Sequence, residues 1–236
     1  MNFSMRRVNA IFQKDFKDIL RNSVVSVTML MPLIMAFFVS KSSNDVSIEL
    51  HYMIINLTLV TVGSFVQCCL IAEEREKNTL RGLMLSPAST LEILSGKSLL
   101  SFFTTMILIV ASAFLTGYQP EKIVLIAIAI VFSSLFFIGM GTLLGLFAKS
   151  VMEASVIILP VMLIFGFGSM FTMFTEKYPI LKVFDYTPNM QLIEIAVKVE
   201  SGIGISGLWA NFGIISLWII VIYALAAFVF KKRKMD

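Results

Sequence analysis

Two short stretches of the sequence have the spacing of phosphate-binding motifs. Residues 95–98 (SGKS) resemble the end of a nucleotide-binding loop, in which backbone amides and a lysine hold phosphates. That loop needs a glycine at position 91, where Leu91 stands, and no strand precedes it. Residues 202–207 spell GxGxxG, but they also lack a preceding strand and an acidic residue about 20 positions later. The sequence therefore predicts no nucleotide site in this chain.

The sequence offers few side chains that could bind a metal or act as acids and bases in catalysis. His51 is the one histidine, and Cys68 and Cys69 are adjacent in an apolar run, whereas a zinc site needs several converging ligands. The long apolar stretches contain no Asp, Glu, Lys or Arg. They therefore offer no carboxylate pair for an intramembrane protease and no ionisable residue for a proton- or ion-coupled carrier. We predict no catalytic residue, no metal and no cofactor bound by this chain.

The polar residues within the apolar stretches are uncharged and gather on two helix faces. They are Asn56, Gly63 and Gln67 on one stretch, and Ser101, Thr105 and Ser112 on another. Such faces ordinarily form hydrogen bonds between neighbouring membrane helices. Alternatively they line a transport pathway, which together with Phe and adaptable Met would suit an amphipathic or hydrophobic cargo better than an ion. The sequence leaves both interpretations open.

The composition indicates that membrane helices must position these groups. Of 236 residues, 58% are hydrophobic and 14% are charged, whereas a soluble domain carries about 25% charged residues. A domain of this size cannot hide so much apolar surface from water. The composition excludes a soluble enzyme and a disordered chain, and it argues against nucleic acid as a partner.

Six charge-free apolar stretches approach the roughly 17 to 25 residues that a membrane-spanning helix needs. They are Ser23–Val39, Tyr52–Ala72, Leu99–Leu115, Ile123–Phe147, Ala154–Phe174 and Phe212–Phe230. Backbone polar groups in lipid must be satisfied internally, so each stretch is expected to be a helix. We predict an all-α membrane protein with six transmembrane helices, in which residues 1–236 form a single domain.

Small residues and prolines predict how two of these spans are shaped and packed. The fifth span carries Pro160, Gly166 and Gly168 and is expected to bend. Gly141 and Gly145 form a GxxxG pattern in the fourth span, which favours close packing against another helix. The pattern does not say whether that helix belongs to the same chain.

The distribution of Lys and Arg predicts the orientation. Fourteen of these residues lie on one side of the predicted spans and five on the other. Because basic residues accumulate on the cytoplasmic side, both termini are expected in the cytoplasm of a multi-pass protein of the cell membrane. The same basic side would bind anionic membrane lipid.

Residues 1–22 predict an amphipathic interfacial helix. Its apolar face consists of Val8, Ile11, Phe12, Phe16, Ile19 and Leu20. Such a helix lies in the headgroup plane with its basic side toward water. It serves as an anchor or, in addition, contacts a cytoplasmic partner.

The segment from Glu73 to Ser98 predicts a short cytoplasmic helix between spans two and three. Span two continues through Glu73–Lys77, where an i,i+4 ion pair forms. A short apolar helix with Leu80, Leu83, Met84 and Leu85 follows, and Pro87 ends it. Ser89–Glu92 then reads as a capping box. Exposed apolar side chains need a membrane or protein surface to cover them.

Residues 175–211 form the largest segment predicted outside the cell. The segment is too apolar for a solvated loop and too interrupted to span, with Pro179 and Pro188 each followed by apolar residues. Two short re-entrant helices that dip into the outer leaflet before span six fit this pattern.

The whole pattern resembles the ABC-2 family of exporter permeases. The residues that carry the resemblance are Glu74-Arg75-Glu76, Thr79-Leu80, Leu83, Leu85-Ser86-Pro87, Ser89, Gly96-Lys97 and the prolines Pro179 and Pro188. The resemblance implies an ATPase on a separate chain that binds ATP and Mg. It further implies that the short helix after span two couples to that ATPase, and that two permease chains, identical or related, form the pathway.

The resemblance assigns ATPase coupling to one group of residues. They are Glu73, Glu74, Arg75, Glu76, Thr79, Leu80, Arg81, Leu83 and Met84. In length and style the chain is similar to permeases of Gram-positive exporters of antimicrobial or cytolytic peptides, which implies a peptide cargo. We therefore expect a non-catalytic permease subunit. The alternatives are an exporter of lipids or drugs, an immunity or scaffold protein that sequesters a toxic peptide, and an ATP-independent channel or carrier.

Overall fold

The computed structural model describes residues 4–42, 46–77, 90–171 and 178–235, and within these ranges it contains helices and no strand. The first elements along the chain are α1 (Met5–Arg21), α2 (Ser23–Ser42), α3 (Ile48–Thr58), the π-helical η1 (Leu59–Val66) and α4 (Gln67–Glu76). The long middle helices are α6 (Thr90–Thr116) and α7 (Ile123–Phe147). The remaining elements are α8 (Val151–Ile157), α9 (Leu159–Val161), the π-helical η2 (Met162–Gly166), α10 (Gly168–Phe171), the 3-10 helix η4 (Pro179–Tyr186), α11 (Pro188–Glu200), η5 (Ile205–Gly207) and α12 (Trp209–Met235).

Among the described residues, five helices are long and apolar enough to cross a membrane. They are Ser23–Ser42, Ile48–Glu76, Glu92–Thr116, Ile123–Phe147 and Trp209–Lys232. They correspond to the predicted spans one, two, three, four and six. The second of them, formed by α3, η1 and α4 in succession, extends past the apolar stretch as expected. There Lys77 and Glu73 form the predicted ion pair at 2.5 Å.

The predicted fifth span is a shorter and irregular helix. Its apolar part covers Val151–Gly166, with a turn at Ile158 just before Pro160 and a bend at Phe167. Pro160 has no backbone N–H to donate, so the expected irregularity is present. At its start α8 packs against α4, and at its end α10 packs against α11. The segment therefore runs between the two ends of the bundle, and the sixth membrane crossing stays a prediction.

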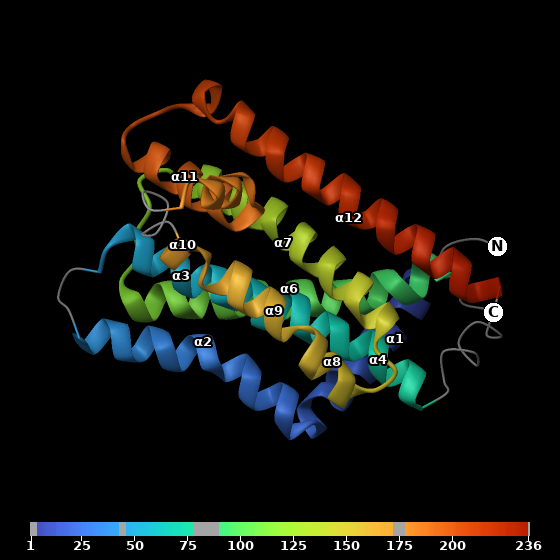
Figure 1. The fold of residues 1–236 in the computed structure, drawn as a ribbon. Coiled ribbons are helices and arrows are strands. Elements are labelled where there is room, and N and C mark those ends of the chain that lie inside the picture. Colours follow the sequence, from blue (N-terminus) through green and yellow to red (C-terminus); the bar gives the residue numbers. More distant parts are fainter. Residues whose placement is uncertain (1–3, 43–45, 78–89, 172–177, 236) are drawn as a thin grey trace.

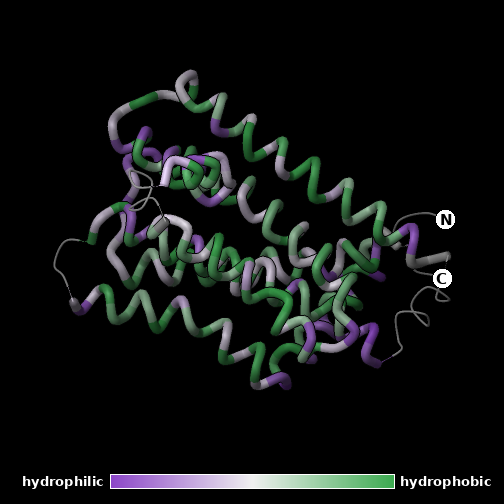
Figure 2. The backbone as a smooth tube through the Cα atoms, in the orientation of Figure 1, coloured by the Kyte–Doolittle hydropathy of each residue, from purple (hydrophilic) through white to green (hydrophobic). Residues whose placement is uncertain are grey.

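The long helices lie side by side, and the segment with α8, α9 and α10 runs along them (Figure 1). Helix α1 lies at one end of the bundle and α11 at the other. We call the end with α1, the end of α4 and the last turns of α12 the α1 end, and the opposite end with η4 and α11 the α11 end. Figure 2 shows hydrophobic residues along the middle of the bundle and hydrophilic residues near its ends. Helix α1 and the last turns of α12 share one end, which agrees with termini on one side of a membrane. Which side faces the cytoplasm stays a prediction.

The helix formed by α3, η1 and α4 is the centre of the fold. Its apolar window is entirely buried, whereas 17% of the corresponding windows of α2 and α12 is buried. Glycines let α7 approach it closely: a Cβ at Gly141 would lie 2.2 Å from the Ser64 carbonyl oxygen, and one at Gly145 would lie 2.8 Å from that of Cys68. The GxxxG pattern therefore packs against a helix of the same chain.

Helix α1 packs on the bundle along a different stripe from the predicted one. Val8 and Ile19 are buried as expected, but Phe16 and Leu20 are exposed and Asp15 is buried. The reason is that α1 lies against α6 and α2. Its position at a membrane interface stays a prediction.

The segment before α12 contains two short helices, η4 and α11, and each begins at a proline as predicted. Helix α11 packs against α3, α7 and α12 and buries Leu192, Ile195 and Ala196, whereas η4 exposes Ile180 and Val183. Their re-entry into the outer leaflet stays a prediction.

Candidate coupling site

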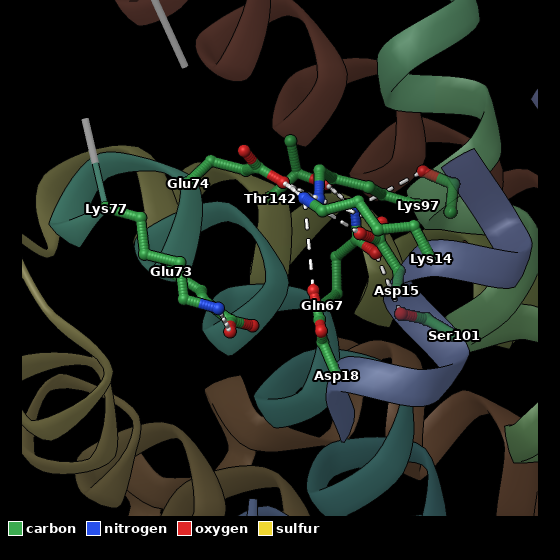
Figure 3. Close-up of polar contacts among 11 residues, drawn as sticks. Lys14, Asp15, Asp18, Gln67, Glu73, Glu74, Lys77, Lys97, Ser101 and Thr142 are labelled. Atoms are coloured by element: carbon green, nitrogen blue, oxygen red, sulfur yellow. Dashed lines mark hydrogen bonds and ion pairs between the residues drawn. The ribbon is translucent and has the colours of Figure 1, made fainter. Parts of the chain in front are cut away.

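A buried lysine joins three helices at the α1 end. The Lys97 side chain on α6 is 1% exposed, and its Nζ lies 2.8 Å from the Asp15 Oδ2 on α1 and 3.0 Å from the Glu74 Oε1 on α4. Figure 3 shows these side chains converging from their helices. Burying an unpaired ammonium group would cost several kcal/mol, so the two carboxylates are what allow Lys97 to be there.

A second lysine balances the charge of this cluster. Lys14 Nζ donates to Glu74 Oε1 at 2.5 Å and lies 3.8 Å from Asp15. Burial raises the pKa of the Asp15 carboxyl, against the opposing effect of Lys97. Burial lowers the pKa of Lys14, but its hydrogen bond and charge contact with Glu74 outweigh this and raise the pKa above its usual range. We call Lys14, Asp15, Glu74 and Lys97 the ion cluster.

A separate ion pair fastens the start of α1 to the start of α6. Glu92 is completely buried, and its carboxylate accepts hydrogen bonds from Arg7 at 2.7 and 3.1 Å. The backbone amide of Ser4 also donates to Glu92. Glu92 was predicted to complete a capping box with Ser89, which lies outside the described residues. In the structure it binds α1.

Gly96 sets the distance between α1 and α6. A Cβ at this position would lie 3.1 Å from the Val8 carbonyl oxygen and 3.0 Å from the Ile11 side chain. The absence of a side chain lets α1 come close enough for the neighbouring Lys97 to reach Asp15. The Gly96-Lys97 pair thus holds α1 and α6 together.

The end of α4 is connected to two other helices. Arg75 Nη1 donates to the carbonyl oxygens of Leu146, Phe147 and Ala148 at 3.0 to 3.2 Å. These carbonyls end α7, where no further helical N–H can reach them. Glu76 accepts from the Val151 amide at the start of α8, at 2.9 Å. The approach to the predicted coupling helix is therefore anchored inside the chain.

The spacing of Ser150 and Glu153 in the sequence predicts a capping box, and the structure has this cap at the start of α8. The Ser150 hydroxyl accepts from the Glu153 amide at 3.2 Å, and Glu153 in turn accepts from the Lys149 amide at 2.7 Å. This confirms the serine cap of the predicted capping box.

A network of uncharged hydrogen bonds lies next to the ion cluster (Figure 3). Gln67 Oε1 accepts from the Ser101 hydroxyl at 2.8 Å, and its Nε2 donates to Thr142 Oγ1 at 2.9 Å and toward Ser98 Oγ at 3.4 Å. Gln67 is fully buried. The network joins α4, α6 and α7 without a formal charge.

The six predicted pathway residues are all buried, and some of them lie in contact with each other. Gln67 binds Ser101, and a Cβ at Gly63 would lie 3.6 Å from the Thr105 hydroxyl. Thr105 and Ser112 donate to carbonyls of their own helix. Asn56 Nδ2 donates to the Asn189 carbonyl at 3.4 Å, and its Oδ1 has no partner among the described residues. The arrangement supports packing within one chain, and a role in a pathway stays a prediction.

The predicted coupling residues divide into two groups. Glu73, Glu74, Arg75 and Glu76 lie at the end of α4. Thr79, Leu80, Arg81, Leu83 and Met84 lie outside the described residues. Contact with an ATPase stays a prediction for both groups.

Sequence reasoning missed Asp15, Lys97, Glu92 and Arg7 as parts of this site. One signal was present: Asp15 stands seven residues after Val8, within the helical stripe that α1 buries. A lone acid in an apolar stripe indicates a buried partner. In the described part of the chain, no group of three or more His, Cys, Asp and Glu side chains is placed to hold a metal ion.

Comparison with known proteins adds one finding to this geometry. Residues 40–228 match the family described as ABC-2 family transporter protein, and the match covers more than half of the chain. No protein of curated function matches the chain.

Proposed function

The chain belongs to the ABC-2 family of transporter proteins, and from this premise we propose that it is the permease of an ATP-driven exporter of amphipathic or hydrophobic peptides. The family makes it a membrane subunit of an ABC transporter, and such a subunit works with an ATPase partner. In our proposal ATP and Mg are bound by that separate chain, and two permease chains form the pathway.

The ion cluster supports a route by which ATP hydrolysis on the partner chain would move the helices of the permease. Helix α4 ends at Glu76 and α6 begins at Thr90, so both flank the predicted coupling helix. Lys97 binds Glu74 on α4 and Asp15 on α1. A displacement of the coupling helix by the ATPase would therefore move α4, α6 and α1 together.

We assign different tasks to the predicted coupling residues. Glu74, Arg75 and Glu76 position the segment, because each is bound to another helix of the chain. Leu80 and Leu83 would contact the ATPase, because a short apolar helix outside the membrane needs a covering surface.

Co-purification of the ATPase tests the coupling assignment. Leu80→Asp with Leu83→Asp should release the ATPase, because carboxylates would replace apolar contacts in the interface. Ile180→Asp with Val183→Asp is the matched control, since it has the same spacing on exposed positions of η4 at the α11 end. Unchanged co-purification with the Leu80/Leu83 variant would contradict the assignment.

The cargo proposal rests on the absence of charge along the five long helices, apart from their ends. A highly charged cargo would cross the middle of the membrane without a partner, which is costly. Uncharged groups such as Gln67 and Thr105 could instead hydrogen-bond to a peptide backbone. Both are buried in a single chain here, so this use requires helix rearrangement in the two-chain assembly.

Uptake into inverted membrane vesicles that contain the permease and its ATPase tests the cargo. Amphipathic helical peptides should accumulate when ATP is supplied, and Gln67→Leu with Thr105→Leu should reduce the uptake without releasing the ATPase. Thr28→Leu is the control, because Thr28 is half-buried on α2, away from the polar network, and its hydroxyl bonds to its own helix. Accumulation of lipids or drugs alone would refute the peptide cargo, and peptide binding without ATP-dependent uptake would indicate sequestration.

Cysteine labelling tests the orientation. In a chain without Cys68 and Cys69, single cysteines at Ser43 and Gly202 should react with an impermeant reagent added outside the cell. One at Lys77, which is about half exposed at the α1 end, should react only after permeabilisation. Labelling of position 77 from outside would overturn the topology and the coupling assignment with it.

A further inference from the structure

A groove of about 520 Å³ opens on the side of the bundle between α6 and α12. Its floor is α7, and α1 closes one end. The apolar and aromatic lining includes Val8, Leu99, Phe102, Leu135, Ile138 and Tyr223. The volume falls within the roughly 300 to 1,000 Å³ of small-molecule sites.

Two glycines explain why this face is hollow. A Cβ at Gly139 would lie 2.8 Å from Ile222 and 3.0 Å from the Tyr223 ring, so α12 rests directly on α7 there. Gly96 brings α1 equally close to α6. These contacts set α12 on one side of α7 and the α1–α6 pair on the other, and Leu135 between them remains 38% exposed.

The groove has the depth of one membrane leaflet. Its α7 stretch, from Val131 to Ile138, covers roughly 10 Å and stops about 13 Å short of the end of α7. Tyr223 lies about 12 Å before Lys231 on α12. On α6 the lining residues Ser95 to Phe102 lie about 8 to 18 Å from the first residue of that helix, so the groove runs from the α1 end to the middle of α7, which is roughly half of a hydrocarbon core about 30 Å thick.

Exposed basic residues lie at the α1 end, toward which the groove runs. Arg6 is exposed beside the lining residue Met5, and Lys231 and Lys232 are exposed on the last turns of α12. The first turn of α1 contains no acidic residue. An apolar slot of leaflet depth that runs toward basic residues complements a lipid that has a hydrocarbon chain and a negative phosphate.

We propose that this groove binds one acyl chain of an anionic phospholipid, whose phosphate is held by Arg6, Lys231 and Lys232. Ile107 on α6 and Ile220 on α12 stand for general lipid contact, because both are exposed and neither lines the groove. The bound lipid would join α1, α6 and α12. The proposal does not depend on a peptide cargo.

A lipid bound in the groove would lie next to the hydrogen-bond network of Gln67. Ser98 lines the groove, and its hydroxyl lies 3.4 Å from Gln67 Nε2. Lys97 of the ion cluster is the preceding residue on α6. A lipid in the groove would therefore stabilise the face of α6 that carries both sets of contacts, by binding the folded state.

Photo-crosslinking of the purified full-length chain tests the site. The probe is a phosphatidylglycerol with a diazirine in the middle of one acyl chain, and mass spectrometry locates the adducts. Adducts at Leu99, Phe102 and Leu135 should exceed those at Ile107 and Ile220. Unlabelled phosphatidylglycerol should compete roughly 100-fold better than phosphatidylcholine, since each of the three basic residues at an anionic headgroup contributes a factor of about five.

Two pairs of variants separate the groove from its surroundings. Ser98→Phe with Leu135→Trp should fill the groove and lower its adducts about tenfold, whereas Ile220→Trp should leave them unchanged. Lys231→Gln with Lys232→Gln should remove most of the preference for phosphatidylglycerol, whereas Lys17→Gln on the exposed face of α1 should retain it. If the groove-filling variant does not fold, the lysine variants decide the matter, because both positions are exposed.

Three outcomes would overturn the proposal. Equal labelling of the groove and of Ile107 would show general lipid contact. Equal competition by phosphatidylcholine would show that the site does not recognise the negative charge of the headgroup. Displacement of the probe by an amphipathic helical peptide, but not by phosphatidylglycerol, would assign the groove to cargo.

Discussion

The two ends of the bundle are held together by different interactions. At the α1 end, buried ion pairs join helices that are far apart in the chain: Lys97 with Asp15 and Glu74, and Arg7 with Glu92. At the α11 end, the long-range contacts include neutral hydrogen bonds and a partly exposed lysine, Lys122, whose Nζ donates to the carbonyl oxygens of Gly202 and Ile203 at 3.0 and 3.2 Å. His51 lies 3.0 Å from the Thr116 hydroxyl, and the Tyr52 and Tyr118 hydroxyls are 3.0 Å apart.

The contrast extends to the charges that the α11 end does contain. Lys198 pairs with Glu194 one turn away on the same helix, and it also binds Asn211 at 2.9 Å. A charge-assisted contact across helices is stronger and more directional than a neutral one. We infer that the elements of the α1 end move as a unit, as force transmission requires, and that the α11 end rearranges more easily.

The largest effect is expected from Lys97→Met. It removes the buried partner that Asp15 and Glu74 share and leaves them with the half-exposed Lys14, and breaking a buried ion pair typically costs about 3–5 kcal/mol. The matched variant at the α11 end, Lys198→Met, should cost about 1 kcal/mol, because that lysine is partly exposed. Thermal unfolding of the purified proteins measures both. Equal losses of Tm would erase the distinction between the ends.

A smaller effect is expected from Gly96→Val. The new side chain must push α1 away from α6 at the Val8 carbonyl, and such overpacking costs about 1–3 kcal/mol. Gly204→Val near the α11 end is the control, because a Cβ there has no neighbour within 4 Å. Tm gives the stability, and cysteine crosslinking between α1 and α6 reports their separation. A variant at Gly96 that keeps both values would show that α1 does not need this close approach.

The pH dependence sharpens the contrast further. Burial raises the pKa of Asp15 in the folded protein above its unfolded value of about 3.9. The folded state therefore binds this proton more tightly, and the stability contributed by Asp15 falls as the pH rises through the raised pKa.

Comparison with Asp15→Asn isolates this effect, because the amide stays neutral at every pH. The Tm of the natural chain relative to that variant should fall as the pH rises above about 4. A constant difference for Asp15→Asn would argue that Lys97 fully compensates the burial.

The smallest effects are expected from ion pairs on the surface. Lys77→Gln at the α1 end and Glu194→Gln at the α11 end each break a partly exposed i,i+4 pair. Both should cost about 0.3–0.5 kcal/mol, because solvent screens such pairs. Similar, small values would show that burial, and not the mere presence of charge, separates the two ends. A large loss for Lys77 alone would mean that it has a role beyond Glu73.

Local features made much of the fold predictable. The fourth span was expected at Ile123–Phe147, and α7 has the same bounds, because charged residues flank an unbroken apolar stretch. The Glu73–Lys77 pair and the Ser150 cap followed from spacings within a single turn. Prediction was weaker for the fifth span, since Pro160 signals a break without saying how much of the helix survives.

The candidate site was predictable only in part. Glu74 was expected to face an ATPase, yet its carboxylate lies in the ion cluster. Asp15 was assigned to neither face of its helix. The reason is that a hydrogen-bond partner 82 residues away leaves no mark on local periodicity.

The sequence by itself determined that this chain is a bundle of apolar helices with basic ends, and it pointed to the transporter family. Helical period, apolar length and caps act over a few residues and can be read one segment at a time. The tertiary structure alone decided that GxxxG packs within the chain, that Lys97 is buried between Asp15 and Glu74, and that a groove remains between α6 and α12. These outcomes depend on how closely separate helices approach, and that distance is set by all the side chains at their contacts together.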